Sequence, residues 1–147
     1  KNLIFEANKK GVSSERIIFS ERLPQKKDHL ERIKLADLFL DTYPYSAHTT
    51  CSDALRSGLP ILTIMGESFA SRVASSLLTT MNLTELIADS FENYEKQANN
   101  LFNDQIYFKE LKEKVKSSSI GSVLYDSEIY TKNIEKAYRK ITDNFKK

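Results

Sequence analysis

The sequence LFLDTYPYSAHTTCSDALRSGLPILT, residues 38–63, determines the fold that we expect for this chain. Its first residues form a short apolar run, which predicts a buried strand over 38–41, and residues 61–63 have the character of the next strand. Between them, a turn-rich segment leads into polar residues suited to begin a helix, and Gly58 and Pro60 end that helix. The stretch therefore predicts a strand–loop–helix–strand unit with polar side chains at the start of the helix.

The start of this helix has two interpretations. Thr50 and Asp53 have the spacing of a capping box, with Asp in the place usually held by Glu or Gln, and His48 is then an ordinary loop residue. Alternatively, the threonine hydroxyls and the unpaired N–H groups of the first turn bind a phosphate. In that case Asp53 faces the ribose of a nucleotide, because a carboxylate is repelled by phosphate. The residues alone leave both interpretations open.

The flanking sequence extends the unit in both directions. In chain order, we expect a helix over 1–10 that ends at Gly11, a strand over 16–19, a helix over 28–36, the strand over 38–41, a helix from residue 50 and the strand over 61–63. A further helix follows, whose inner face carries Phe69, Val73 and Leu77 with Ala70, Ala74 and Leu78 beside them, and then a strand over 86–88. Helices and strands alternate with short connections, which predicts an α/β fold with a Rossmann-like parallel sheet of about four strands and flanking helices.

From Ser90 onwards the pattern is helical, with a polar break over 117–122. We expect one domain over 1–147, with an α/β core over 11–89 and a helical C-terminal region over 90–147. The last helix has an apolar side that consists of Ile129, Tyr130, Ile134, Ala137, Tyr138, Ile141 and Phe145.

The net charge, the cysteine count and the length of the apolar runs limit the classes of function that this chain can have. Among 147 residues, 22 Lys and Arg against 20 Asp and Glu give a net charge of +2, so neither a nucleic acid nor an anionic membrane is required as a partner. The one cysteine, Cys51, excludes an internal disulfide and fits a reducing, cytoplasmic location. No apolar run reaches membrane-spanning length and no secretory signal is visible. Because the chain begins with Lys1 rather than Met, we expect a piece of a longer protein.

Basic residues also gather early in the helix predicted over 28–36, where Lys26 and Lys27 precede His29 and Arg32. They are either a solvated helix end or a site for an anion or an aromatic base, since lysines at a helix start oppose the helix dipole. For Ser68, Ser71 and Arg72 the ordinary interpretation is close helix–sheet packing and surface charge. Cys51 has no His or Cys partner at metal-binding spacing. The residues alone thus lead to an α/β domain with a candidate site for a nucleotide-like anion.

Five stretches of the chain resemble the C-terminal catalytic lobe of the O-linked N-acetylglucosamine (O-GlcNAc) transferase family, the tetratricopeptide-bearing glycosyltransferases. They are RIIFS (16–20), LADLFLDT (35–42), HTTCSD (48–53), GLPILT (58–63) and GESFASRVASS (66–76), in the family's order and spacing. The resemblance implies a GT-B arrangement, in which two Rossmann-like lobes face a cleft and the second lobe holds most of the sugar nucleotide. The core over 11–89 would then be the nucleotide-sugar-binding part of that lobe.

The resemblance also implies roles for seven residues. These are His48, Thr49 and Thr50 at the diphosphate, Asp53 at the ribose, His29 and Arg32 around the uracil, and Lys26 near the nucleotide. The implied reaction is inverting transfer of N-acetylglucosamine from UDP-N-acetylglucosamine to a Ser or Thr hydroxyl of an acceptor protein. It needs no metal or other cofactor, because the helix dipole and basic side chains would stabilise the leaving diphosphate.

In that family the first lobe, the helical repeats and a lysine at the diphosphate precede the segment that this chain matches. We therefore expect that the catalytic residues lie upstream and that the 147 residues alone do not catalyse transfer. The terminal helix of GT-B proteins crosses back to the first lobe, so we expect its apolar side to drive dimerisation here. The alternative to an enzyme is a non-catalytic nucleotide-binding or protein-interaction domain of the same fold.

Overall fold

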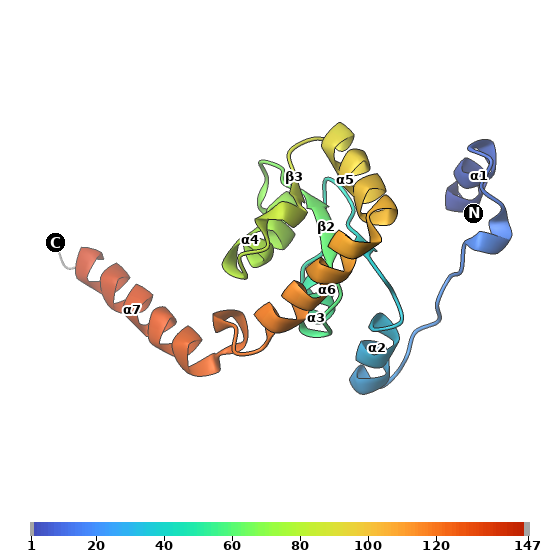
Figure 1. Ribbon diagram of the computed structural model, residues 1–147. Coiled ribbons are helices and arrows are strands. Elements are labelled where there is room, and N and C mark those ends of the chain that lie inside the picture. The colour runs from blue at the N-terminus through green and yellow to red at the C-terminus, as the bar shows by residue number, and fades with distance from the viewer. Residues whose placement is uncertain (1, 146–147) are drawn as a thin grey trace.

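The computed structural model describes residues 2–145 (Figure 1). Its helices and strands are α1 (Asn2–Lys9), α2 (Lys26–Ile33), β1 (Phe39–Leu40), α3 (Thr49–Arg56), β2 (Ile61–Ile64), α4 (Val73–Thr80), β3 (Ile87–Ala88), α5 (Phe91–Asn103), α6 (Gln105–Ser119) and α7 (Ser127–Phe145). Short 3₁₀ turns, η1 (Ser14–Arg16), η2 (Phe69–Ser71), η3 (Thr84–Leu86) and η4 (Val123–Tyr125), connect several of them.

The sheet is parallel with the strand order β1-β2-β3. Phe39 pairs with Ile61 at one side of β2, and Thr63 pairs with Ile87 at the other. All four residues of β2 are buried, as expected for the central strand of a parallel sheet that helices cover on both faces. The α/β fold class predicted from the alternation of helices and strands is confirmed.

Within residues 2–145 the sheet has three strands rather than about four, because the strand predicted over 16–19 does not form. Arg16 ends η1, and the next residues run extended without pairing to β1. Ile18 and Phe19 are 85% and 61% exposed. An apolar run forms a strand only where a neighbouring strand and a buried face receive it, and this segment contacts neither.

Apolar side chains from both faces of the sheet form the core. α4 and α5 pack against β2, and α6 packs against α3 and α5. The core residues are Cys51, Leu55, Ile61, Ala74, Leu78, Met81, Leu83, Leu86, Leu101, Leu111 and Val115. The helix expected from Phe69 begins only at Val73, and Phe69 is 82% exposed. The rest of the predicted face packs inward, since Ala74 and Leu78 are buried and Val73 and Leu77 are half-buried.

Two helix boundaries have clear local causes. Gly58 has a φ of 78°, a conformation that glycine adopts without strain, and it turns the chain from α3 into β2 as predicted. α2 begins at Lys26, two residues earlier than predicted, with Gln25 at its N-cap. Asp28 therefore lies inside the first turn, where its carboxylate faces the positive end of the helix but does not cap it.

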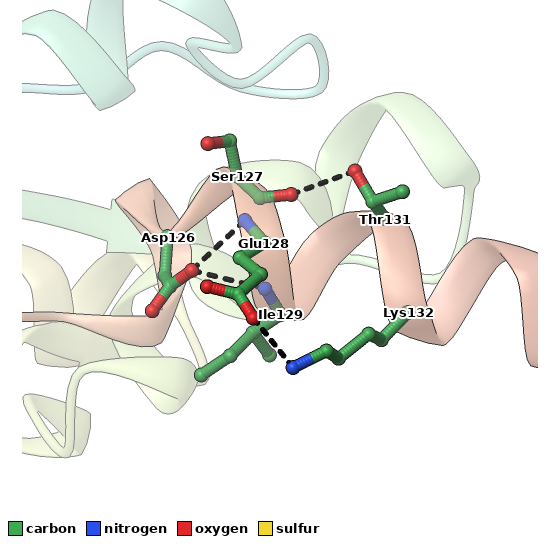
Figure 2. A network of polar contacts seen from close by, with 6 residues as sticks. All are labelled: Asp126, Ser127, Glu128, Ile129, Thr131 and Lys132. Atoms are coloured by element: carbon green, nitrogen blue, oxygen red, sulfur yellow. Dashed lines mark hydrogen bonds and ion pairs between the residues drawn. The ribbon is translucent and has the colours of Figure 1, made fainter.

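The last helix is capped locally and leaves the body of the molecule. Asp126 Oδ1 accepts hydrogen bonds from the N–H groups of Glu128 and Ile129, both at 2.9 Å, and Glu128 pairs with Lys132 at 2.6 Å (Figure 2). These contacts satisfy the first turn of the helix and support its exposed face. No residue of α7 is buried, and Figure 1 shows α7 and α1 projecting on opposite sides of the sheet. The apolar side predicted for the last helix is thus largely in solvent.

No helix within residues 2–145 combines the length and the hydrophobicity that crossing a bilayer requires.

Candidate functional site

The site is built at the carboxyl edge of the sheet, where β1 leads into the loop before α3. Asp41 directly follows β1, and its N–H donates to the carbonyl of Leu62 on β2 at 3.0 Å. The following loop returns to the sheet at Ser46 and Ala47 and then enters α3. Ligands of parallel α/β sheets bind at this edge, because the loops and the helix N-termini converge there.

The first turn of α3 presents unpaired donors. The helix begins at Thr49, and the first intrahelical bond runs from the N–H of Ser52 to the carbonyl of His48 at 3.1 Å. Among residues 2–145, the N–H groups of Thr49, Thr50 and Cys51 have no protein acceptor. Thr49 and Thr50 are exposed and border an open hollow of about 460 Å³. The partial positive charge of a helix N-terminus thus faces solvent beside two hydroxyl groups.

The capping box predicted for this helix is wrong. The N-cap is His48, whose side chain makes no capping bond, and Thr50 already lies within the helix. Asp53 turns away from the helix start, and its Oδ1 lies 3.3 Å from Nζ of Lys26 on α2. Because the N-cap is His48, two residues before the Thr50 that the box requires, neither Thr50 nor Asp53 lies at the position from which it would cap the helix.

His48 is held in a fixed orientation on the surface. Its ring stacks on Tyr45 with centroids 4.8 Å apart and meets Phe69 edge-on at 5.9 Å. Nε2 lies 3.3 Å from the carbonyl oxygen of Ala70. A carbonyl oxygen only accepts, so Nε2 carries the proton in this contact, and Nδ1 is left for other interactions.

The loop over residues 66–71 supports this arrangement from β2. Ser46 donates to the carbonyl of Ala70 from both its Oγ, at 2.7 Å, and its N–H, at 2.9 Å. Gly66 fits against Ser71 so closely that a Cβ added at Gly66 would lie 2.3 Å from Ser71 Oγ. Ser71 is buried and bonded to Ser68. These serines therefore pack the loop, as the ordinary interpretation of the sequence held.

The basic residues of α2 form the second half of the candidate site. Lys26 is 67% exposed and pairs with Asp53, whose side chain is only 13% exposed. One turn later, Arg32 Nη2 donates to His29 Nδ1 at 3.4 Å, and Arg32 Nη1 donates to the carbonyl of Glu21 at 2.6 Å. The ion pair between Lys26 and Asp53 is the contact that joins this cluster to α3.

Two buried groups beside the site have raised pKa values. Burial, and then the charge of Asp41, raise the pKa of the Cys51 thiol to about 12, so this buried cysteine stays protonated and unreactive. The same two causes raise the pKa of Tyr94 to about 12. The Tyr94 hydroxyl donates to the backbone carbonyl of Asp41 at 2.9 Å and so ties α5 to the end of β1.

Sequence reasoning found the surface of the site but missed its support. The structure brings His48, Thr49 and Thr50 to one helix start and links Asp53 to Lys26. The sequence analysis assigned no role to Asp41 or Ser46, which are both buried below that helix start. The available signal for Asp41 was its position as the first polar residue after an apolar strand, at the edge where ligands bind.

Two further observations concern the surroundings. Within residues 2–145, no three His, Cys, Asp or Glu side chains come close enough to share a metal ion. A larger hollow of about 730 Å³ lies near the amino end of β1, between Asp37, Phe102, Phe108 and Lys112. It contains none of the candidate residues and lies at the opposite end of the strand from α3.

Comparisons with known proteins find similar chains across most of this sequence. The family model for glycosyl transferase family 41 matches residues 1–134. The probable UDP-N-acetylglucosamine–peptide N-acetylglucosaminyltransferase SEC of Arabidopsis thaliana is 35% identical over 132 residues, which are 89% of this chain and 13% of that protein. The UDP-N-acetylglucosamine–peptide N-acetylglucosaminyltransferase of Caenorhabditis elegans is 36% identical over 126 residues, 86% of this chain and 11% of that protein.

The fold is also similar to that of a solved enzyme. A mutant O-GlcNAc transferase of Thermobaculum terrenum superposes with a TM-score of 0.87 and 32% sequence identity, over 95% of this chain and 26% of that chain. The chain therefore spans only 11% to 26% of the length of these similar proteins.

Proposed function

Because this chain belongs to glycosyl transferase family 41, we propose that it is the UDP-sugar-binding part of a protein O-glycosyltransferase. The family membership implied by the five sequence stretches is confirmed. The proposed donor is UDP-N-acetylglucosamine, and the proposed acceptor is a Ser or Thr hydroxyl of another protein, because the similar proteins are named as UDP-N-acetylglucosamine–peptide transferases.

The observation that carries the proposal is the open N-terminus of α3. A diphosphate at this point would accept from the unpaired N–H groups of Thr49 and Thr50 and from their hydroxyls. These donors are already oriented, since Cys51, Ala54 and Leu55 anchor the helix in the core. The helix tip thus supplies a fixed positive end for the leaving diphosphate, with no reorganisation during the reaction.

The two remaining parts of the nucleotide would lie toward α2. Asp53 is the acceptor one turn inside α3, and we propose that it binds the ribose hydroxyls. Lys26 neutralises Asp53 in this structure and is exposed enough to turn toward a diphosphate. His29 and Arg32 offer a ring and a guanidinium plane for the uracil, and their mutual contact fixes both.

We propose inverting transfer that uses no metal ion, in which the α3 dipole and Lys26 offset the charge of the leaving group. The catalytic base is expected outside this chain, and so is the first lobe, so we propose that the 147 residues alone bind the donor but do not turn it over. The cytoplasmic location stays a prediction that rests on Cys51.

We also propose that α7 mediates dimerisation. Its apolar side is exposed at Tyr130 (66%), Tyr138 (65%) and Ile141 (52%). An exposed stripe of this length is typical of an interface. Sedimentation should show a concentration-dependent dimer that Tyr138→Asp converts to monomer while Lys140→Asp does not. A wild-type chain that stays monomeric at high concentration would contradict this interface.

Titration of UDP into the polypeptide tests the central proposal. We expect binding, and Asp53→Ala should weaken it by about 1–3 kcal/mol because a charge-assisted hydrogen bond is lost. Asp143→Ala, which removes an exposed carboxylate from α7, is the matched control and should leave the affinity unchanged. No binding by the wild type, or equal affinities for the wild type and Asp53→Ala, would leave α3 with a structural role only.

A further inference from the structure

Asp41 is the one charged residue that is buried within the described chain, with 8% of its surface exposed. Burial of a carboxylate is costly unless donors satisfy its oxygens. Asp41 Oδ1 accepts from the N–H groups of Thr42, at 2.9 Å, and Ala47, at 2.8 Å, and Oδ2 accepts from the Thr63 hydroxyl at 2.7 Å. These three donors satisfy both oxygens, and none of them comes from solvent.

The donors belong to different segments. Thr63 is on β2, whereas Thr42 directly follows Asp41 and Ala47 is the last residue of the loop between β1 and His48. Oδ1 therefore closes the loop on itself, and Oδ2 fastens the closed loop to the central strand. Inside the loop, the Thr42 hydroxyl donates to the carbonyl of Tyr45 at 2.8 Å, which tightens the same turn.

The helix that follows does not depend on this anchor. Cys51, Ala54 and Leu55 are each 0% exposed, so apolar packing fixes the body of α3 and with it Asp53. His48, the N-cap, lies only one residue beyond Ala47 and is half-buried, with its ring stacked on Tyr45 and its Nε2 bonded to the Ala70 carbonyl. The path of the loop into the helix start therefore depends on the bond between Ala47 and Asp41, together with the contacts of Ser46 and His48 to Ala70.

We propose that Asp41 is a positioning residue for the anion site, because it sets the path of the loop that places His48 and the first free N–H groups of α3. The inference rests on the proposed binding of a nucleoside diphosphate at this helix start. Asp41 does not touch the ligand in this role, since its own oxygens are taken by backbone and hydroxyl donors.

The direction in which Asp41→Asn changes UDP affinity distinguishes a positioning role from a purely electrostatic one. Asp41 lies beside the hollow that Thr49 and Thr50 border, so its negative charge repels a diphosphate placed there. If the charge alone mattered, Asp41→Asn would tighten UDP binding. If Asp41 positions the loop, the same change weakens UDP binding, because the amide accepts less strongly from the Ala47 N–H and its NH₂ group faces the Thr63 hydroxyl.

The test measures UDP and uridine binding by ligand-observed NMR for the wild type, Asp41→Asn and Asp41→Ala, in the longest form of the protein in which the wild type binds UDP. We expect a loss of UDP affinity of about tenfold for Asp41→Ala, which corresponds to one charge-assisted hydrogen bond, and a smaller loss for Asp41→Asn. Uridine affinity should not change, because uridine lacks the diphosphate and Asp53 stays in place. Asp37→Asn is the charge-matched control at the exposed amino end of β1.

Amide hydrogen exchange is the second readout and needs no ligand. Asp41→Ala should speed exchange across residues 42–50 while leaving α3 beyond Ser52 protected. Unchanged exchange in this loop, tighter UDP binding by Asp41→Asn, or equal loss of UDP and uridine affinity would each overturn the inference. A wild type that binds no UDP but shows the exchange result would instead overturn the proposed function and leave the positioning of the loop standing.

Discussion

The two halves of the candidate site are held in different ways. The helix start at His48 lies on an element with three fully buried side chains, and it is supported by the buried groups of Asp41 and Ser46. The basic cluster of Lys26, His29 and Arg32 lies on α2, which has no buried residue. One ion pair, between exposed Lys26 and Asp53, joins the second half to the first.

This difference in burial between α3 and α2 indicates which part of the site is pre-organised. Donors fixed by a packed core need no ordering when a ligand binds, whereas a helix held by an exposed ion pair loses freedom on binding. The core of this chain therefore fixes the helix start, where we propose that the diphosphate binds. The basic residues of the second half, Lys26, His29 and Arg32, are all present, but the orientation of α2 depends on surface contacts that are weaker than those of the core.

The largest expected change in the free energy of unfolding comes from truncating a core side chain of α3, and the same kind of change on α2 gives a direct comparison. Leu55→Ala on α3 should lower the free energy of unfolding by about 2–5 kcal/mol, because it leaves a cavity in the core. Ile33→Ala on α2 should cost about 1 kcal/mol, since that side chain is only partly buried. Urea denaturation of both variants gives the two values. Equal costs would show that α2 is packed as firmly as α3.

Tyr94 tests how α5 supports the end of β1. Tyr94→Phe should lower the free energy of unfolding by about 1 kcal/mol at neutral pH, because the hydrogen bond to Asp41 is lost. The folded protein raises the pKa of Tyr94 from 10.0 to about 12, so the neutral phenol is favoured in the folded state. Its contribution is present below pH 10 and is lost as the pH rises toward 12.

The same prediction has an alkaline readout. Between pH 10 and pH 12 the wild type should lose more stability than Tyr94→Phe, as measured by thermal unfolding at several pH values. Tyr130→Phe on exposed α7 is the control and should keep the wild-type pH dependence. A Tyr94→Phe variant with an unchanged alkaline loss would assign that loss to other groups.

The smallest effect concerns the link between the halves. Lys26→Met should change the free energy of unfolding by about 1 kcal/mol or less, because Lys26 is 67% exposed and surface ion pairs contribute little. Thermal unfolding at low and high salt measures this contribution. A larger loss that disappears at high salt would mean that the ion pair, rather than the core, holds α2 in place.

Much of the fold was predictable because the core follows simple patterns. The run at Ile61 is apolar at every position and becomes the fully buried central strand. Gly58 ends α3 as predicted, with the positive φ that glycine accepts. The strand predicted over residues 16–19 does not form, since a short apolar run does not reveal whether a partner strand is available to pair with it.

The candidate site divides in the same way. The residue types at the helix start predicted an anion site there, because free N–H groups occur at every helix N-terminus. The capping box failed because it depends on which residue is the N-cap. The N-cap is His48, two residues before Thr50, and Asp53 pairs with Lys26 instead. Such boundaries are the least certain part of any sequence pattern.

The sequence by itself determined the α/β class, the order of the elements around the central strand, and the polar helix start that carries the candidate site, because local periodicity and turn residues encode these features. Only the tertiary structure decided that Asp41, Ser46 and Thr63 lie beneath that start, that Asp53 pairs with Lys26, and that residues 16–19 stay unpaired. These depend on contacts between residues far apart in the chain, which local patterns do not encode, and the buried polar groups among them each require a partner.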